Sequence, residues 1–67
     1  SAIGNISGLV IQALKEIGRE NVTDPEIQII LSHLKNEELH RLQHDIRLAP
    51  EWIRVIMRKA IIEKNEE

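Results

Sequence analysis

The feature that most limits the fold of this chain is Pro50, which lies between two runs of helix-forming residues. A proline disfavours the helical conformation of the residue before it, so a helix arriving from the N-terminal side must end by Ala49. The same proline fits the start of a following helix, where its missing N–H is not needed. The second half of the chain is therefore predicted to form two helices, about 37–47 and 50–64.

Apolar residues in the first half recur every three to four positions, which is the period of a helix with one buried face. This spacing predicts helices over about 6–18 and 25–34. Asn5 or Ser7 can cap the start of the first helix, because short polar side chains accept hydrogen bonds from its free N–H groups. Gly18 can end that helix in a left-handed conformation.

The cap of the second helix is open to more than one interpretation. Asp24 is predicted to cap the second helix, with Pro25 as its first residue. Thr23 and Glu26 have the spacing of a competing capping box. Asn36 is predicted to cap the third helix.

These elements predict an all-α fold, a compact bundle of four short helices forming a single small domain over 1–67. Short connections predict that consecutive helices are neighbours in space. Leu48 is expected to pack inward from the bend before the last helix. The chain does not begin with Met, and we expect it to be the C-terminal fragment of a longer protein.

Composition excludes several classes of protein. The chain has no cysteine, so it forms neither a disulfide nor a thiolate metal site. Its net charge of −2 mixes both signs and favours no polyanionic partner for the chain as a whole. No run approaches the roughly 18 apolar residues that span a bilayer, and the start lacks the basic region of a signal peptide. We therefore expect a cytoplasmic protein that does not contact a membrane.

The histidines are the strongest candidates for chemistry. His40 and His44 are four residues apart on one helix face, and His33 lies just before them. A zinc protease motif would place Glu after the first histidine, but the chain has Arg41 there. The carboxylates at the start of the third helix are explained by the helix dipole, and no glycine-rich phosphate loop is present. We predict no enzymatic activity, no cofactor and no metal.

The last helix carries more apolar residues than one buried stripe requires, which is typical of a helix covered on more than one side. Trp52 is the only aromatic residue, and it fits either the core or the centre of a binding surface. We predict a non-enzymatic interaction module that self-associates or docks on another domain of its parent protein. The predicted interface consists of Trp52, Val55, Ile56, Met57 and Ile62.

Basic residues suggest an alternative function. Residues 41–59 carry five basic and two acidic side chains, a local charge of +3. A tight turn followed by a helix with arginines is the outline of a helix-turn-helix domain. Against this, a recognition helix needs an exposed polar face, whereas apolar residues crowd this one. The nucleic-acid contacts of the alternative would be Arg47, Arg54, Arg58 and Lys59.

Several short runs between about residues 8 and 60 resemble the C-terminal segment of bacterial DUF6088-type proteins, which are related to abortive-infection antitoxins of type IV toxin–antitoxin systems. The run 45–53 is the most specific of them. The others are Ala13-Leu14, Ile17-Gly18, Asn21-Val22-Thr23-Asp24, Leu31 with Leu34, and Glu38 with Leu42.

This resemblance implies a context rather than a set of site residues. Such proteins look like a winged-helix DNA-binding domain followed by a further domain. The antitoxin relatives repress their own operon and counter a nucleotidyltransferase-like toxin. No winged-helix portion is present in this chain, so no DNA-binding residue is carried over from that family.

Overall fold

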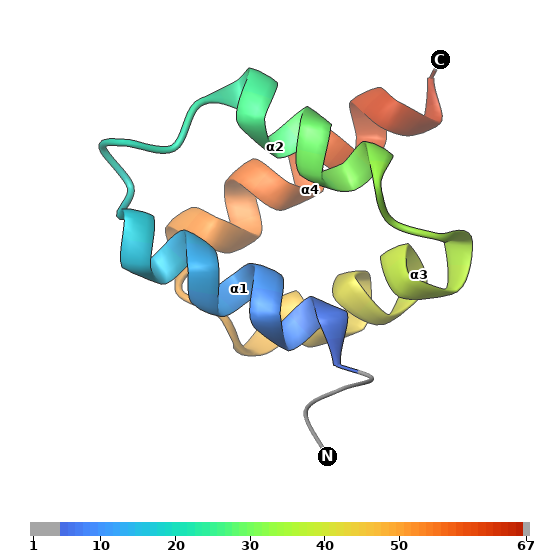
Figure 1. The fold of residues 1–67 in the computed structure, drawn as a ribbon, viewed down its shortest axis with the longest axis horizontal. Helices are drawn as coiled ribbons and strands as arrows, with labels where there is room; N and C mark the ends of the chain where they lie inside the picture. Colours follow the sequence, from blue (N-terminus) through green and yellow to red (C-terminus); the bar gives the residue numbers. More distant parts are fainter. Residues whose placement is uncertain (1–4, 67) are drawn as a thin grey trace.

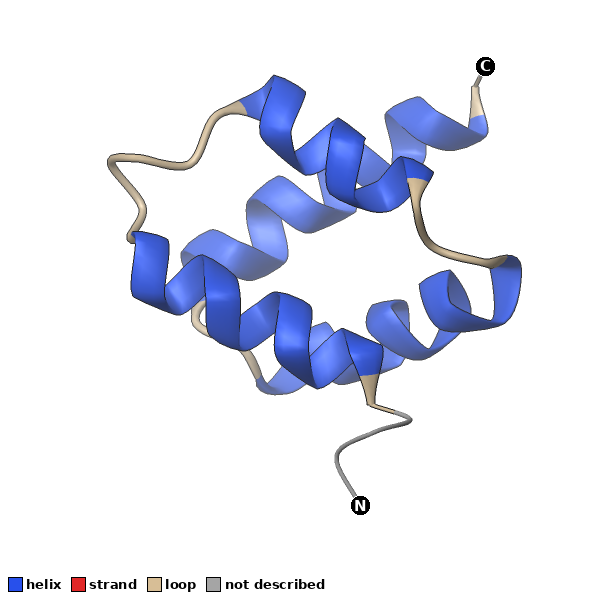
Figure 2. Ribbon diagram, viewed as in Figure 1, coloured by secondary structure: helices blue, strands red, loops and turns tan. Residues whose placement is uncertain are grey.

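The computed structural model describes residues 5–66 of the chain. They form only helices and connecting turns, so the all-α prediction is confirmed (Figures 1 and 2). None of these helices is long and apolar enough to cross a membrane. The elements are α1 (Ile6–Ile17), α2 (Asp24–Ser32), α3 (Asn36–Asp45), a 3-10 turn (Ile46–Leu48) and α4 (Glu51–Asn65).

The helices pack in alternate rather than consecutive pairs. The closest pairs are α1 with α3 and α2 with α4, and Figure 1 shows α4 running behind α2. The prediction that consecutive helices are neighbours in space did not identify these alternate pairs, which have the most extensive packing. The connection 18–23 leads the chain away from α1 before α2 begins, and the 3-10 turn redirects it between α3 and α4. An apolar stripe identifies the buried face of a helix but not the helix that covers it.

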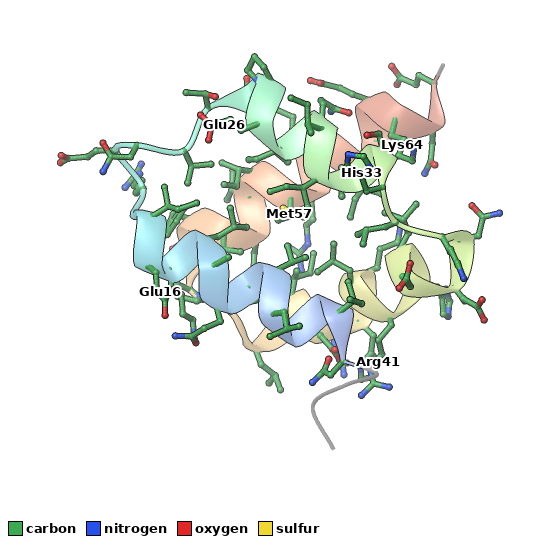
Figure 3. All side chains as sticks on the ribbon, viewed as in Figure 1. Glu16, Glu26, His33, Arg41, Met57 and Lys64 are labelled. Carbon is green, nitrogen blue, oxygen red and sulfur yellow. The ribbon has the colours of Figure 1, made fainter. Side chains whose placement is uncertain are left out.

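Aliphatic residues from all four helices form one core. Met57 lies at its centre, fully buried between the helices (Figure 3). Burial of such side chains is the main stabilising contribution in a chain without disulfides. The buried apolar residues are Leu14, Ile27, Leu31, Leu39, Leu42, Ile46, Ala49, Ile53, Met57, Ala60 and Ile61.

Leu48 does not pack inward as predicted, because its side chain is 90% exposed. The reason is the 3-10 turn, in which side chains three residues apart share one face. Ile46 and Ala49 are three apart and both buried, so the intervening Leu48 points away from the core.

The ends of α1 agree with the sequence. The side-chain oxygen of Asn5 accepts a hydrogen bond from the Gly8 N–H at 3.0 Å, so Asn5 is the cap. Gly18 has the positive φ angle expected of it, 88°, with ψ at 148°. Its N–H donates to the carbonyl of Leu14 at 3.0 Å, which closes the last turn of the helix.

The caps of α2 and α3 each lie one residue before the predicted one. Thr23 is extended at the start of α2, and its hydroxyl donates to a Glu26 carboxylate oxygen at 2.8 Å. Lys35 has the same place before α3, where its N–H donates to Glu38 at 2.8 Å. In both helices this register places a glutamate three residues after the cap, which is the capping-box position. Asp24 and Asn36 are therefore the first residues of their helices.

Candidate functional site

The outer face of α4 carries large apolar side chains that the fold leaves in solvent. Val55 and Ile62 are each 58% exposed, although both lie on the same helix as the core residue Met57. They are seven residues apart, which places them on one side of the helix. Leu48, seven residues before Val55, is the most exposed large apolar residue of the described chain.

The remaining residues of the predicted interface lie closer to the core. Trp52 and Ile56 are half-buried and pack against it, so Trp52 belongs partly to the core and partly to the surface. Met57 is fully buried, and it therefore cannot form part of an external surface of this fold. Beside Val55, a surface hollow is lined by Arg19, Glu51, Trp52, Val55 and Ile56.

Most of the predicted nucleic-acid contacts are engaged within the chain. Arg47 donates from Nε to the His44 carbonyl at 3.0 Å, and Arg54 donates from Nη1 to the Ala49 carbonyl. Lys59 lies 3.7 Å from a carboxylate oxygen of Asp24, on the neighbouring helix α2. Arg47 and Arg54 thus bind backbone carbonyls of the protein itself, whereas the pair of Lys59 with Asp24 is exposed to solvent.

Arg58 differs from the other three cations. Its side chain is exposed and has no polar partner among residues 5–66. It borders a hollow between α3 and α4 that is also lined by Gln43, Ile46, Ile61 and Ile62. The structure therefore places Arg58 at the edge of the apolar face of α4 and does not gather the four cations as one free patch.

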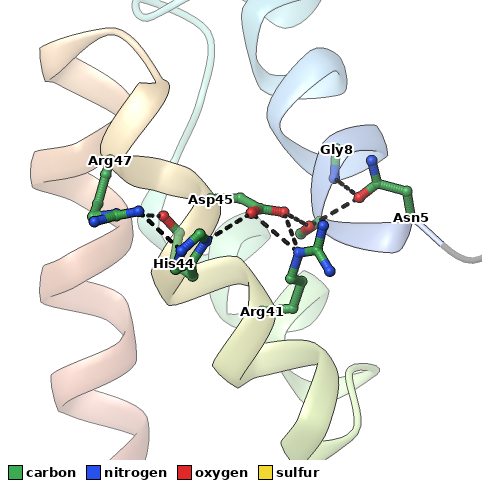
Figure 4. Close-up of polar contacts among 7 residues, drawn as sticks. Asn5, Gly8, Arg41, His44, Asp45 and Arg47 are labelled. Carbon is green, nitrogen blue, oxygen red and sulfur yellow. Dashed lines mark hydrogen bonds and ion pairs between the residues drawn. The ribbon is translucent and has the colours of Figure 1, made fainter.

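A second candidate site lies where α1 meets α3 (Figure 4). Ser7 is only 2% exposed, and its hydroxyl donates a hydrogen bond to Oδ2 of Asp45. The hydroxyl also lies 3.1 Å from Oδ1 of Asn5. Because one proton serves both acceptors, the charged carboxylate is the stronger partner.

Asp45 is the centre of this polar cluster. Both of its oxygens accept from Nε of Arg41, at 3.1 and 3.0 Å, and Oδ1 lies 3.2 Å from Nδ1 of His44. The hydrogen bond from Ser7 contributes most to lowering the pKa of the Asp45 carboxyl below its ordinary value. The hydrogen bond from His44 lowers that pKa further, burial opposes these two effects, and the hydrogen bond and charge of Arg41 add smaller decreases.

The hydrogen bonds of His44 define its tautomer. Nη2 of Arg47 can only donate, and it lies 2.9 Å from Nε2 of His44, so Nε2 is the acceptor. The proton is therefore on Nδ1, where it is donated to Asp45. Both ring nitrogens are occupied, which leaves His44 no lone pair for a metal ion.

Serine, histidine and aspartate thus meet, but not in the order that acyl transfer needs. In a hydrolase triad the histidine contacts the serine and removes its proton. Here Asp45 lies between Ser7 and His44, and a carboxylate of low pKa is a poor base. The arrangement is suited to joining α1 to α3.

The histidines do share one surface hollow, which Glu37, His40, Arg41 and His44 line on α3. Arg41 lies among the possible ligands and repels a cation. Within residues 5–66, no three His, Cys, Asp or Glu side chains are arranged to hold a metal ion.

Sequence reasoning missed both Ser7 and Asp45 as partners. A signal was present for Ser7, because it lies seven residues before Leu14, at a position of the α1 stripe that an apolar residue would normally fill. Leu48 and Glu51 were also missed as parts of the α4 surface. Their exposure depends on the path of the 3-10 turn, which the spacing of apolar residues in the sequence did not reveal.

Comparison with known proteins gives one family. The model of a family of unknown function, DUF6088, matches residues 1–42. No curated protein and no solved structure matches the chain. The match ends before the run 45–53, so that part of the resemblance has no support from it. Since the match covers more than half of the sequence, the chain belongs to the DUF6088 family.

Proposed function

We propose that this chain is a non-enzymatic protein-interaction module that docks on its partner through the outer face of α4. The observation that carries this proposal is the exposure of Leu48, Val55 and Ile62 at intervals of seven residues. Single exposed apolar residues are ordinary on a protein surface, but two on one side of α4, with a third in the turn that leads into it, are typical of a contact site.

The setting of this row supports the proposal. Half-buried Trp52 and Ile56 border it and pack against the core, so the exposed apolar side chains are in contact with buried ones. Arg58 lies at its edge, as arginines commonly do at the rim of a protein interface. Interfaces of this composition gain affinity mainly from the central apolar and aromatic side chains.

Site-specific photo-crosslinking tests the proposal. A photoreactive phenylalanine analogue is introduced at Val55 or Ile62 in the native gene product, expressed in its own host. We expect ultraviolet light to join each variant covalently to one defined protein species, which mass spectrometry identifies. The physical reason is that a docked partner excludes water from these two positions and lies within reach of the probe.

Ile29 provides a matched control, because it is also 58% exposed but lies on α2, away from this surface. We expect no defined product from the probe at Ile29. The absence of a product at both Val55 and Ile62, or an equal product at Ile29, would contradict a docking function for α4.

The proposal has two further parts, the setting of the module in its parent protein and an alternative function. The family resemblance suggests that such a module is the C-terminal domain of an antitoxin-like bacterial regulator in the cytoplasm. Nucleic-acid binding is the alternative function, and it would depend chiefly on Arg58, since Arg47, Arg54 and Lys59 already have partners. Docking through the apolar face is the favoured function, because the exposed apolar side chains form a larger surface than the one cation without a partner among residues 5–66.

A further inference from the structure

We propose that the partner of this surface is a second copy of the chain, bound by antiparallel pairing of the two α4 helices about a two-fold axis near Val55. This inference rests on the proposed function, since it names the occupant of the same surface. It also specifies which residues face each other.

The exposed face of α4 contains more than apolar residues. Glu51, Val55, Arg58 and Ile62 follow one another at spacings of four, three and four, and all four are exposed. This is the spacing of the two core positions of a coiled coil, but here only one of the two positions is apolar and the other carries charges. Leu48 lies outside the helix, in the 3-10 turn before α4, and adds one more exposed apolar side chain at that end. We call these five residues the α4 seam.

The two charges of the α4 seam lack partners within the chain. Neither Glu51 nor Arg58 forms an ion pair with any of the residues 5–66. They lie seven residues apart, about 10 Å along the helix axis, which is too far for them to pair with each other. Both charges are exposed to solvent and can pair with opposite charges on a partner.

An antiparallel second copy supplies both charges at once. With the axis near Val55, Glu51 lies opposite the partner's Arg58, and Arg58 opposite the partner's Glu51. The same register brings the two Val55 side chains together and places the partner's Ile62 beyond the N-terminal end of α4, the end at which Leu48 lies. The contact is self-complementary, as a two-fold interface requires.

Other pairings of the same helices bring like charges together. In a parallel pair, Glu51 faces the partner's Glu51 and Arg58 faces the partner's Arg58. In an antiparallel pair shifted so that Val55 faces the partner's Ile62, the two Arg58 side chains lie opposite each other and beside Lys59. Like charges across a seam are unfavourable, so of these three pairings the charge pattern favours the one centred on Val55.

The dimer is expected to be weak. One pair of α4 helices, each of 15 residues, buries less than the roughly 1,200 Å² of a standard stable interface. A dissociation constant on the order of 100 µM is therefore expected, so association must be sought at high protein concentration.

Sedimentation equilibrium between about 10 µM and 1 mM tests the register by charge exchange. We expect the wild-type chain to dimerise in this range. Glu51→Arg and Arg58→Glu, each alone, are expected to weaken dimerisation about tenfold, because each variant turns both ion pairs of the dimer into repulsions. An equimolar mixture of the two variants is expected to restore it, since every seam charge then meets its opposite.

Glu20→Arg is the matched control, because it makes the same charge change on an exposed residue outside the α4 seam. It is expected to leave dimerisation unchanged, and circular dichroism of each variant checks that its helices are intact. A wild-type chain that stays monomeric at about 1 mM overturns the inference, and so does a mixture that associates no better than its components.

These outcomes separate the inference from the proposed function. A monomeric chain whose probe at Val55 crosslinks to a different protein would leave the docking function standing and exclude the second copy. A monomeric chain without any crosslink would remove both.

Discussion

At the scale of single residues, the contact between Ser7 and Asp45 joins two helices through side chains that are 38 positions apart in the sequence. Ser7 is buried at this contact. Its hydrogen bond is strongest when Asp45 is ionised, because a charged acceptor strengthens a hydrogen bond. The pKa of Asp45 lies below its ordinary value of 3.8, chiefly because of the Ser7 hydroxyl. The charged form of Asp45 is therefore more stable, relative to its protonated form, in the folded state than in the unfolded state.

This shift predicts a loss of stability in acid. Because the folded pKa of Asp45 is lower than the unfolded one, its contribution is present in full above the ordinary pKa and disappears as pH falls through the folded pKa. Asp45→Asn removes the titrating group, so we expect its melting temperature to fall less steeply between about pH 5 and pH 2 than that of the wild type. Thermal melts followed by circular dichroism measure the difference.

Glu20→Gln is the control for this experiment, because Glu20 is an exposed carboxylate in the connection after α1. Its melting curve should follow that of the wild type across the same pH range. An NMR titration of the Asp45 carboxyl gives an independent reading, since Ser7→Ala should raise the pKa of that group. An unchanged pKa in Ser7→Ala would show that the serine does not hold the carboxylate.

At the scale of the elements, the end of α1 depends on one backbone conformation. Gly18 has φ 88° and ψ 148°, a combination that is available almost only to glycine. Gly18→Ala should lower the free energy of unfolding by about 1–3 kcal/mol. An added methyl group would meet no atom within 4 Å, so the whole effect would be backbone strain.

Urea unfolding measures this change, with Glu20→Ala as a substitution in the same connection that should shift the free energy of unfolding by less than about 0.5 kcal/mol. Equal effects of the two substitutions would mean that the connection adapts without strain.

The elements also show what the sequence can reveal. The spacing of apolar residues and the position of Pro50 predicted four helices, since both act through neighbours along the chain. The caps at Thr23 and Lys35 were misplaced by one residue because adjacent registers offer similar local bonds. The chosen register also sets which side chains face the core, and only the packed structure determines that.

Long-range features were beyond this reasoning. The pairing of α1 with α3, and the contact of Ser7 with Asp45 within it, join residues whose separation no local pattern encodes. The exposure of Leu48 was missed because a three-residue 3-10 turn rotates the chain differently from a continued helix. The candidate surface on α4 was predicted from its excess of apolar residues, but its boundary and its charges required the structure.

At the scale of the whole molecule, one face of α4 packs in the core and the other is proposed to bind a second copy. Substitutions on the two faces should therefore affect folding and association separately. A chain of 67 residues has a total stability of only about 3–10 kcal/mol. Met57 is fully buried, so Met57→Ala should cost about 2–5 kcal/mol and melt much of the helical structure, seen as lost ellipticity at 222 nm.

Ile62→Ala is the matched change on the opposite face of the same helix, where the side chain is 58% exposed. At about 10 µM, where the chain is expected to be monomeric, its melting temperature should equal that of the wild type. Near 1 mM it should sediment as a weaker dimer, because the lost apolar contact matters only when a partner covers it. If Ile62→Ala instead destabilises the dilute monomer as Met57→Ala does, this face belongs to the core and no surface remains for a partner.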